Sequence, residues 1–335
     1  MSIGASRSKV VRYAVLDIGS NTVKLTIVEQ VPTGFYKPIV DVSATTRLGE
    51  DIQARRLTPA AIDRTIDMLL QSLAVCARYE VTALATAATS AVRDAVNADE
   101  FVGRAAEYGI CVTVLTGDEE ARLSTLAVVT DPDLDLDGPI TMVDIGGGST
   151  EIAIFEPGHG QDRRSLQLGC VRLTEAILKS DPTTLQEMQA ARQAVSESMQ
   201  GRPPVIEGAP LIGVGGTMTN MGRVCLARTG LSANLHGLSL SMDEVRAQID
   251  LYASRPIAER KQIAGLDPER ADIILAGALI LEGAMDSARI GSATVSCRGL
   301  RWGVLYDRFQ VTTEPSTPPQ AGSVRAMHLP VGANR

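Results

Sequence analysis

Apolar and polar positions alternate in short runs through the first third of the chain, which is the pattern of β-strands. Strands are predicted at 12–18, 23–28 and 35–42. A longer run at 58–79 repeats its apolar residues every three or four positions and predicts an amphipathic helix. Thr58 is the expected N-cap of this helix, and Pro59 suits its first turn.

Strand and helix patterns then alternate as far as a segment rich in Pro and Asp at 131–138, which is the expected linker. In this part strands are predicted at 81–86 and 110–115, and helices at 90–97, 99–108 and 117–129. The last of these helices opens with three acidic residues, Asp118, Glu119 and Glu120.

The pattern restarts after the linker. Strands are predicted at 140–145, 152–155, 210–214 and 293–296, and helices at 171–179, 185–199, from 218, 241–253, 268–287 and 300–309. Beyond residue 312 the chain is rich in Pro, Ser, Thr and Gly, which is typical of a disordered tail. The N-terminal charges are followed by an apolar stretch that Asp17 interrupts, so no secretory signal is expected.

The two parts share an internal repeat. A shift of 127 residues places Asp-Ile-Gly-Ser-Asn-Thr at 17–22 on Asp-Ile-Gly-Gly-Gly-Ser at 144–149. Each segment follows a predicted strand and precedes an alternating one. We therefore expect both halves of the chain to open with the same β-hairpin.

Composition narrows the function classes. The chain has 335 residues, which predicts two domains, and its net charge of −7 and aromatic content of 3% disfavour nucleic-acid binding. No apolar run approaches the length of a membrane span. Five scattered Cys without a CxxC pair indicate reduced thiols in the cytoplasm. The three His lie far apart, so any metal is expected to be a hard ion on carboxylates.

The repeated hairpin turn suits an anion. Glycines allow close backbone approach, and successive N–H groups in a tight turn form an anion-binding nest. Hydroxyl groups can donate to phosphate oxygens, and an Asp before the turn can hold Mg²⁺ against them. Two such hairpins facing each other would clamp one phosphoryl group from both sides.

Four segments carry a family resemblance, in the order 15–22, 85–94, 116–123 and 143–151, with weaker matches at 168–172, 213–217 and 299–306. On these motifs the chain resembles the exopolyphosphatase / pppGpp phosphohydrolase (Ppx/GppA) family of the actin-like ATPase superfamily. The resemblance implies an α/β fold of two ribonuclease-H-like (actin-like) domains, with mixed sheets flanked by helices and an interdomain cleft. It also implies a homodimer.

The resemblance suggests the following division of the chain. Residues 1–9 are a flexible N-terminus, 10–130 the N-terminal domain, 131–138 the linker, 139–310 the C-terminal domain and 311–335 a disordered tail. The helix near 299–310 is expected to be able to pack back on the N-terminal domain. Longer relatives carry further C-terminal helical domains, so a preference for short substrate chains is expected here.

The resemblance assigns catalysis to Glu120, which would position or deprotonate a water molecule, with Asp144 and Arg93 as partners. Asp144 and Glu151 would hold Mg²⁺, or Mn²⁺. From the residues alone, Glu120 could instead complement the helix dipole, Glu151 could be an ordinary strand residue, and Arg93 a solvated helix residue.

Phosphate binding is assigned to three turns and a lysine. The first turn contributes Asp17, Gly19, Ser20, Asn21 and Thr22, the second contributes Gly146, Gly147, Gly148 and Ser149, and the third contributes Gly215, Gly216 and Thr217. Lys24 would add a cation, although a surface strand lysine is the alternative. The third turn could likewise be a plain strand–helix connection.

The predicted function is a Mg²⁺-dependent exopolyphosphatase that releases orthophosphate from linear polyphosphate. Hydrolysis of pppGpp to ppGpp is the alternative, followed by an actin-like kinase or ATPase and by a non-catalytic polyphosphate or alarmone sensor. One departure from the family pattern is Trp302, which replaces an acid in a helix expected to pack across the domain interface. Cys170 is expected to line the cleft, and His159 and His236 to be exposed loop residues.

Overall fold

The computed structural model describes residues 10–313, so the expected flexible residues 1–9 lie outside its description. The first half forms a five-stranded mixed sheet in the order β3-β2-β1-β4-β5. Its strands are β1 (Arg12–Ile18), β2 (Thr22–Gln30), β3 (Tyr36–Thr45), β4 (Ala83–Ala88) and β5 (Thr113–Val114). The hairpin strands β1, β2 and β3 pair antiparallel, whereas β4 and β5 join in parallel.

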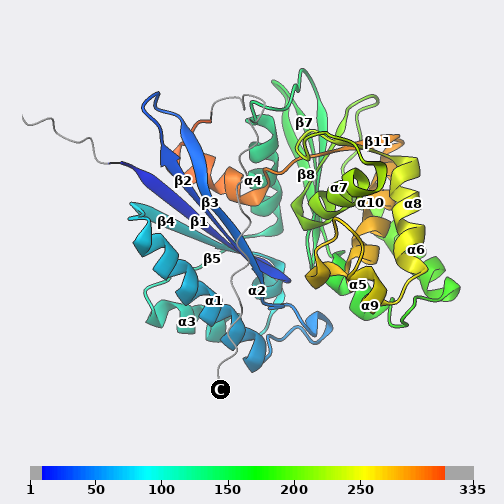
Figure 1. Cartoon of the computed structure of the whole chain (residues 1–335), viewed down its shortest axis with the longest axis horizontal. Coiled ribbons are helices and arrows are strands. Elements are labelled where there is room, and N and C mark those ends of the chain that lie inside the picture. Colours follow the sequence, from blue (N-terminus) through cyan, green and yellow to red (C-terminus); the bar gives the residue numbers. More distant parts are fainter. Residues whose placement is uncertain (1–9, 314–335) are drawn as a thin grey trace, which may run out of the picture.

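Helices cover both faces of this sheet (Figure 1). They are α1 (Pro59–Arg78), α2 (Ser90–Asp94), α3 (Ala98–Glu107) and α4 (Gly117–Val129), with a short 3₁₀ turn η1 (Ile52–Ala54). Ala14, Leu16 and Ile18 pack with α1 and α3, while Val15 packs with α4. Because strand residues alternate between faces, Asp17 belongs to the α4 face.

The second half forms a six-stranded mixed sheet in the order β10-β11-β9-β6-β7-β8. Its strands are β6 (Ile140–Ile145), β7 (Thr150–Glu156), β8 (Gly160–Leu166), β9 (Leu211–Val214), β10 (Ser239–Ser241) and β11 (Ser292–Val295). Met142 packs with Val128 of α4, whereas Val143 and Ile145 face the other core. Asp144 therefore also belongs to the face that α4 covers.

The remaining helices pack mostly around the second sheet. They are α5 (Cys170–Ala176), α6 (Leu185–Met199), α7 (Gly215–Thr229), α8 (Met242–Ala253), α9 (Ile257–Arg260) and α10 (Ile274–Ala288), with a 3₁₀ turn η2 (Pro268–Arg270). The exception is α11 (Leu300–Phe309), which returns to the first half and contacts β1 and α4. In Figure 1, α4 stands between the two sheets. The two mixed sheets with flanking helices confirm the predicted fold class.

Several predicted elements differ in extent. The strand expected at 110–115 is reduced to Thr113–Val114, and the helix expected from 268 begins at Ile274 after the η2 turn. Strands β8 and β10 were not predicted, because β8 is mostly polar and β10 has three residues. Val311 is buried and the Thr312 carbonyl accepts a hydrogen bond from Tyr36, so the ordered chain extends into the segment assigned to a tail. Residues 314–335 lie outside the description, and the domain division remains a prediction.

Among the residues described, no helix has both the length and the apolar character that a membrane span requires.

Candidate active site

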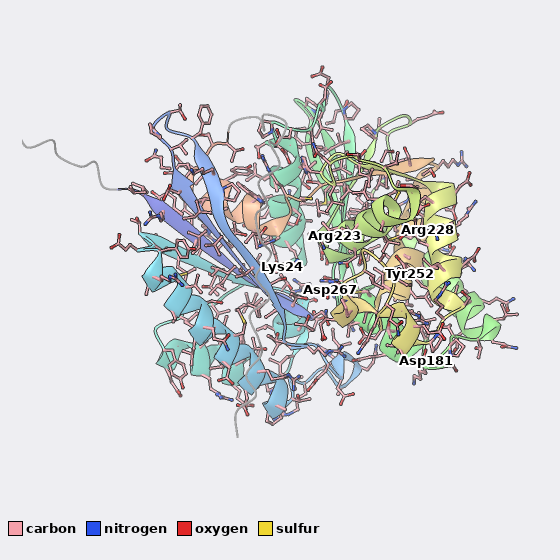
Figure 2. All side chains as sticks on the ribbon, in the orientation of Figure 1. Lys24, Asp181, Arg223, Arg228, Tyr252 and Asp267 are labelled. Carbon is pink, nitrogen blue, oxygen red and sulfur yellow. The ribbon has the colours of Figure 1, made fainter. Side chains whose placement is uncertain are left out.

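A pocket of about 360 Å³ lies between the two sheets and is lined by residues of both halves. The first half contributes the β1–β2 turn and the start of α4, and the second contributes the β6–β7 turn and the start of α7. Figure 2 shows Lys24, Arg223 and Asp267 around this central region. Most of the predicted site residues meet here: Asp17, Gly19, Ser20, Asn21, Thr22, Lys24, Glu120, Asp144, Gly146, Gly147, Ser149, Gly215 and Gly216.

The two hairpin turns have the same geometry. The Gly19 amide donates to the Thr22 carbonyl at 3.1 Å, and the Gly146 amide donates to the Ser149 carbonyl at 3.0 Å. A Cβ atom on either glycine would lie 3.0 Å from that same carbonyl oxygen, so both turns favour glycine for space. The repeat seen in the sequence is therefore a repeat in three dimensions, and both turns line the pocket.

Glu120 lies in the first turn of α4, where it is 6% exposed. Its Oε2 accepts a hydrogen bond from Arg93 Nη1 at 2.9 Å, and the same nitrogen donates to the Leu115 carbonyl. Burial raises the pKa of Glu120 well above its usual value, and the negative charge of Glu151 raises it further, while Arg93 opposes both. Glu120 is thus a buried carboxylate that faces a polar pocket and holds a proton more readily than a free glutamate.

The two acids that precede Glu120 are engaged elsewhere. Asp118 forms a two-pronged ion pair with Arg163, and Glu119 forms one with Arg122. Both side chains are therefore held by arginine partners. Of the three acids that open α4, only Glu120 lines the pocket.

Asp144 and Glu151 stand opposite each other on β6 and β7. Ser124 donates to Asp144 Oδ2 at 2.8 Å, and Ser165 donates to Glu151 Oε1 at 2.7 Å. Burial and the charge of Asp144 raise the pKa of Glu151 to about 7. Burial also raises the pKa of Asp144, although Ser124 and Lys24 oppose that rise.

One oxygen of this carboxylate pair has no partner. Glu151 Oε2 is buried and makes no hydrogen bond within the described residues. Buried carboxylate oxygens normally accept a hydrogen bond. The negative charges of Glu120, Asp144 and Glu151 also repel one another. Asp144 and Glu151 therefore fit a hard divalent cation, whose charge would relieve the repulsion and whose oxygen preference they match.

Lys24 stands opposite Asp17 in the β1–β2 register and lines the pocket. Burial lowers the pKa of Lys24, whereas the charges of Asp17 and Asp144 raise it. No hydrogen bond or ion pair of its ammonium group is found in residues 10–313. The surface-lysine alternative does not fit this position, because the side chain is largely buried and aimed at the pocket.

Three arginines also line the pocket, and the sequence reasoning did not select them as site residues: Arg223, Arg270 and Arg301. Arg270 donates to the Thr22 hydroxyl at 3.3 Å across the cleft. Arg301 contacts Thr26 and Asp41 of the first sheet. Only Arg301 lay in a family segment, so nothing local in the sequence marked the other two.

The third turn brings Gly215 and Gly216 to the pocket, and its phosphate-binding role stays a prediction. A Cβ on Gly216 would collide with the Arg270 guanidinium, so Gly216 makes room for that side chain. Gly215 has φ +90°, and a Cβ there would lie 2.8 Å from Asp144 Oδ1. Thr217 is 1% exposed and packs against Gly277 instead of lining the pocket.

Three other predicted residues lie just behind the pocket lining. Arg93 donates to Glu120 at 2.9 Å and to the Ser149 hydroxyl at 3.4 Å, and its direct contact with phosphate stays a prediction. Gly148 is covered by Ile52 and Ser90 of the first half. Glu151 is 0% exposed, lies opposite Asp144 in the β6–β7 register and raises the pKa of Glu120 by its charge.

His236 is not the exposed loop residue that the sequence suggested. Its Nε2 lies 3.3 Å from Asp131 Oδ2, and its Nδ1 accepts a hydrogen bond from the Cys297 amide. Burial disfavours its charge, but Asp131 and Cys297 raise the pKa of His236 to about 9. Sequence reasoning missed this because the partners are 61 and 105 residues away.

Asp131, Asp133 and His236 place potential ligand atoms within 4.8 Å of one another. The Arg298 guanidinium contacts Asp131 at 3.0 Å and Asp133 at 2.8 Å, so a positive charge already serves both carboxylates. This group ties the residues after α4 to those before α11. It lies at the two places where the chain crosses between the halves, and it is separate from the carboxylates of the pocket.

Comparison with known proteins gives a consistent result. The sequence matches the profile of the Ppx/GppA phosphatase family over residues 26–311. It is 33% identical over 289 residues to Exopolyphosphatase 2 of Mycobacterium tuberculosis, covering 81% of this chain and 89% of that protein. The crystal structure of the Aquifex aeolicus Ppx/GppA family member superposes with a TM-score of 0.74 at 31% identity, covering 90% of this chain and 98% of that one. An exopolyphosphatase structure from Cytophaga hutchinsonii gives a TM-score of 0.81 at 25% identity, covering 91% and 100%.

Proposed function

Because this chain belongs to the Ppx/GppA phosphatase family, with its two-domain actin-like fold, we propose that it is an exopolyphosphatase. It hydrolyses the terminal phosphoanhydride of linear polyphosphate and releases orthophosphate. The observation that carries this proposal is Glu120, a buried carboxylate held by Arg93 beside two turns closed by the same glycine hydrogen bond. Phosphoryl transfer depends on positioning and charge stabilisation, and the pocket supplies groups for both.

The two turns hold the terminal phosphoryl group. Their backbone N–H groups and the hydroxyls of Ser20 and Ser149 approach it from opposite sheets. This two-sided grip keeps the reacting phosphorus in one place relative to Glu120. Holding reactants in line removes much of the entropic part of the barrier.

Glu120 orients the attacking water and accepts its proton. A general base works best when its pKa lies near the working pH, and burial shifts Glu120 in that direction. Arg93 keeps the carboxylate in place through the 2.9 Å hydrogen bond. In this proposal Arg93 positions the base, and the phosphate cations come from other residues.

Asp144 and Glu151 would hold Mg²⁺, or Mn²⁺ in its place, and the unpartnered Glu151 oxygen supports this. When bound, this ion supplies charge neutralisation at the phosphoryl oxygens. The protein's own groups have separate roles. The turns bind the phosphoryl group, Glu120 accepts the proton of the water, and Ser124 and Ser165 orient the two carboxylates.

The rest of the substrate chain lies along the basic wall. Lys24, Arg223, Arg270 and Arg301 line the pocket together with the turns, and none of the described residues that line it is aromatic. Guanidinium groups suit phosphate oxygens, whereas a guanine base would gain from an aromatic partner. The wall thus favours polyphosphate over pppGpp, which is the alternative substrate. A volume of about 360 Å³ is at the small end for ligand pockets and favours short chains.

A phosphate-release panel tests the proposal. Purified protein is given polyphosphates of several lengths, pppGpp and ATP, each with and without Mg²⁺. We expect orthophosphate from short polyphosphate with Mg²⁺ and slower release from pppGpp. Faster turnover of pppGpp would reverse the substrate order, and ADP formation that depends on an acceptor would indicate a kinase. Binding of polyphosphate without any release would indicate a sensor.

We further propose that the protein works as a homodimer in the cytoplasm, in line with the family resemblance. Light scattering of the purified protein at several concentrations measures the first part. A mass of one chain, about 35.5 kDa, at all concentrations would contradict it.

A further inference from the structure

A short segment of the first half is inserted into the second half beside the phosphate-binding turn. It is the knuckle, residues 51–55, which contains η1 (Ile52–Ala54). Asp51 and Arg55 flank η1 with φ values of 58° and 51°, a left-handed conformation that costs non-glycine residues about 1 kcal/mol or more. Ile52, at the tip, is 5% exposed and belongs to the hydrophobic core of the second half.

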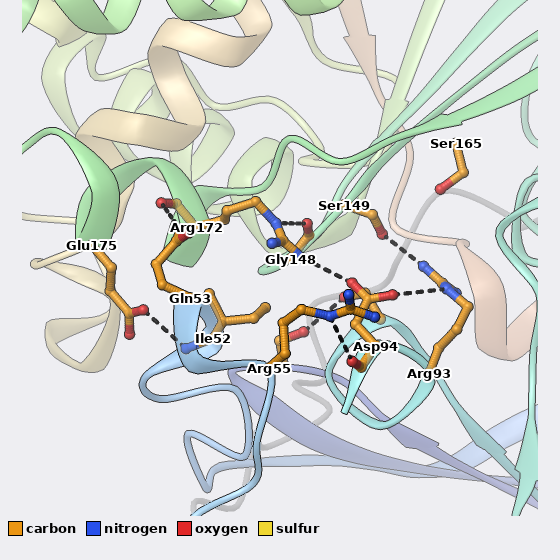
Figure 3. Close-up of polar contacts among 12 residues, drawn as sticks. Ile52, Gln53, Arg55, Arg93, Asp94, Gly148, Ser149, Ser165, Arg172 and Glu175 are labelled. Atoms are coloured by element: carbon orange, nitrogen blue, oxygen red, sulfur yellow. Dashed lines mark hydrogen bonds and ion pairs between the residues drawn. The ribbon is translucent and has the colours of Figure 1, made fainter. Parts of the chain in front are cut away.

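Helix α5 of the second half receives this knuckle (Figure 3). The Asp51 and Ile52 amides donate to the two carboxylate oxygens of Glu175, each at 3.0 Å. Gln53 donates to the Arg172 carbonyl at 3.2 Å. The Asp51 end of the knuckle backbone is therefore held by α5 of the other half, whereas the Arg55 carbonyl accepts from the Val96 amide of the first half at 2.8 Å.

Arg172 connects this contact to the site. Its Nε donates to the Gly148 carbonyl at 2.8 Å, and its Nη2 lies 2.8 Å from Asp94 Oδ2. Asp94 is next to Arg93 on α2 and lies 3.9 Å from the Arg93 Nε. Figure 3 shows this continuous row, from the turn at Gly148 through Arg172 and Asp94 to Arg93.

We propose that the knuckle and α5 form an interdomain latch, in which Arg172 is a positioning residue. Closing the latch places the Gly148 turn of the second half and the Arg93 side chain of the first half in one arrangement. Arg93 in turn holds Glu120 at 2.9 Å. Cleft closure and assembly of the catalytic base are then one event, because the same guanidinium serves both halves.

Physical reasons support a latch over a plain surface ion pair. The Arg172 and Asp94 side chains are each 18% exposed, so the pair is largely desolvated and breaking it leaves a buried charge. Gly148 has no room for a Cβ against Ile52 and Ser90, so the turn of the second half is in close contact with the first half there. Strained segments held by outside partners are typical of switching elements.

The test uses Arg172→Gln, which keeps length and polarity but removes the charge. With the polyphosphate that the wild type uses best, we expect kcat to fall about 10- to 100-fold with KM changed by less than about threefold, since misplacement acts on the reacting geometry. Hydrogen exchange without substrate gives an independent readout. The Asp51 and Ile52 amides should exchange at least about tenfold faster, as expected for loss of roughly one stabilising contact.

Arg104→Gln is the matched control. It removes an Arg–Asp ion pair of similar length, 2.7 Å to Asp63, that lies wholly within the first half. This variant should keep both the wild-type kcat and the wild-type exchange of the knuckle. A wild-type kcat in Arg172→Gln, or an equal loss in Arg104→Gln, would overturn the positioning role.

Asp94→Asn tests the same contact from the other side if Arg172→Gln fails to fold. It should lower kcat by a similar factor, and the double variant should lose less than the product of the two single losses, because the Arg172–Asp94 pair is shared between them. The latch rests on the proposed function only for its kinetic readout. If the wild type releases no phosphate, the proposed function fails, and the exchange of the knuckle amides alone decides the latch.

Discussion

The β1–β2 and β6–β7 hairpins share an antiparallel pairing and the same turn hydrogen bond, but they carry opposite charges at one position. In the first, Asp17 stands opposite Lys24, and in the second, Asp144 stands opposite Glu151. The shift that aligns the two turns also aligns Lys24 with Glu151. The first hairpin therefore carries a carboxylate opposite a lysine, whereas the second carries two carboxylates.

This charge difference indicates which hairpin holds the metal ligands and which one binds phosphate. Acid and base on neighbouring strands neutralise each other, while two buried carboxylates need a proton or a cation from outside. Burial and the charge of Asp144 raise the pKa of Glu151 to about 7. The charge of Glu151 in turn adds to the effect of burial in raising the pKa of Glu120. The first hairpin is thus suited to binding phosphate, and the second to holding a metal beside the base.

The largest expected effect is at the base beside the second hairpin. Glu120→Gln removes the proton acceptor while keeping size and polarity, and we expect kcat to fall about 10³-fold with substrate binding retained. Phosphate release and polyphosphate binding, measured separately, check this. Glu119→Gln is the control, because Glu119 is paired with Arg122 on the outside of the same helix turn. More than a tenth of wild-type activity in Glu120→Gln would remove Glu120 from this role.

The acid–acid pair of the second hairpin predicts an unusual pH dependence of stability. Folding raises the pKa of Glu151 from 4.5 to about 7, so protonation of Glu151 stabilises the folded protein. The contribution is fully present below about pH 4.5 and is lost as the pH rises to about 7, by at most about 3 kcal/mol. Chemical denaturation in EDTA at several pH values measures it, and Glu151→Gln should flatten the curve.

Glu156→Gln, on the same strand and half exposed, is the control for this curve. It should leave the pH dependence of the wild type in place. An unchanged curve in Glu151→Gln would contradict the charge assignment. The Glu151 variant should also bind Mg²⁺ more weakly, which calorimetry detects independently of activity.

The acid–base pair of the first hairpin predicts a smaller effect on binding. Lys24→Met should raise KM about tenfold, with kcat within about threefold of wild type, because one phosphate contact is lost and the base is untouched. Steady-state kinetics across chain lengths measures it. Lys37→Met, on an exposed position of β3, should behave as wild type. A fall in kcat at constant KM would make Lys24 part of the chemical step.

The smallest effect concerns the hydroxyl that supports Glu151. Ser165→Ala removes a 2.7 Å hydrogen bond that lowers the pKa of Glu151. The free energy of unfolding should fall by about 0.5–1.5 kcal/mol. The lower limb of the pH–rate profile should move upward by less than about one pH unit. Ser254→Ala, at an exposed helix end, is the control. A downward shift would show that Ser165 does not stabilise the charged form.

Sequence reasoning recovered elements with strong periodicity and clear caps. The helices at 117–129, 185–199 and 300–309 and the strand at 140–145 have the predicted bounds. It missed β8, whose alternating charges face α4 and solvent and make its pattern polar. Burial at that strand depends on what packs against it, which local pattern does not contain.

The repeated turns and the Asp that precedes each were accessible from residue type and a repeated local pattern. The role of Glu120 came from the family resemblance, because its position at a helix start fits an interaction with the helix dipole equally well. Tertiary structure alone decided the basic wall, the placement of Arg93 behind Glu120 and the contact between the knuckle and α5. Arg270, for example, meets Thr22 across 248 positions of sequence. Such contacts arise when two sheets close on one shared helix, and no short-range pattern encodes the residues that then face each other.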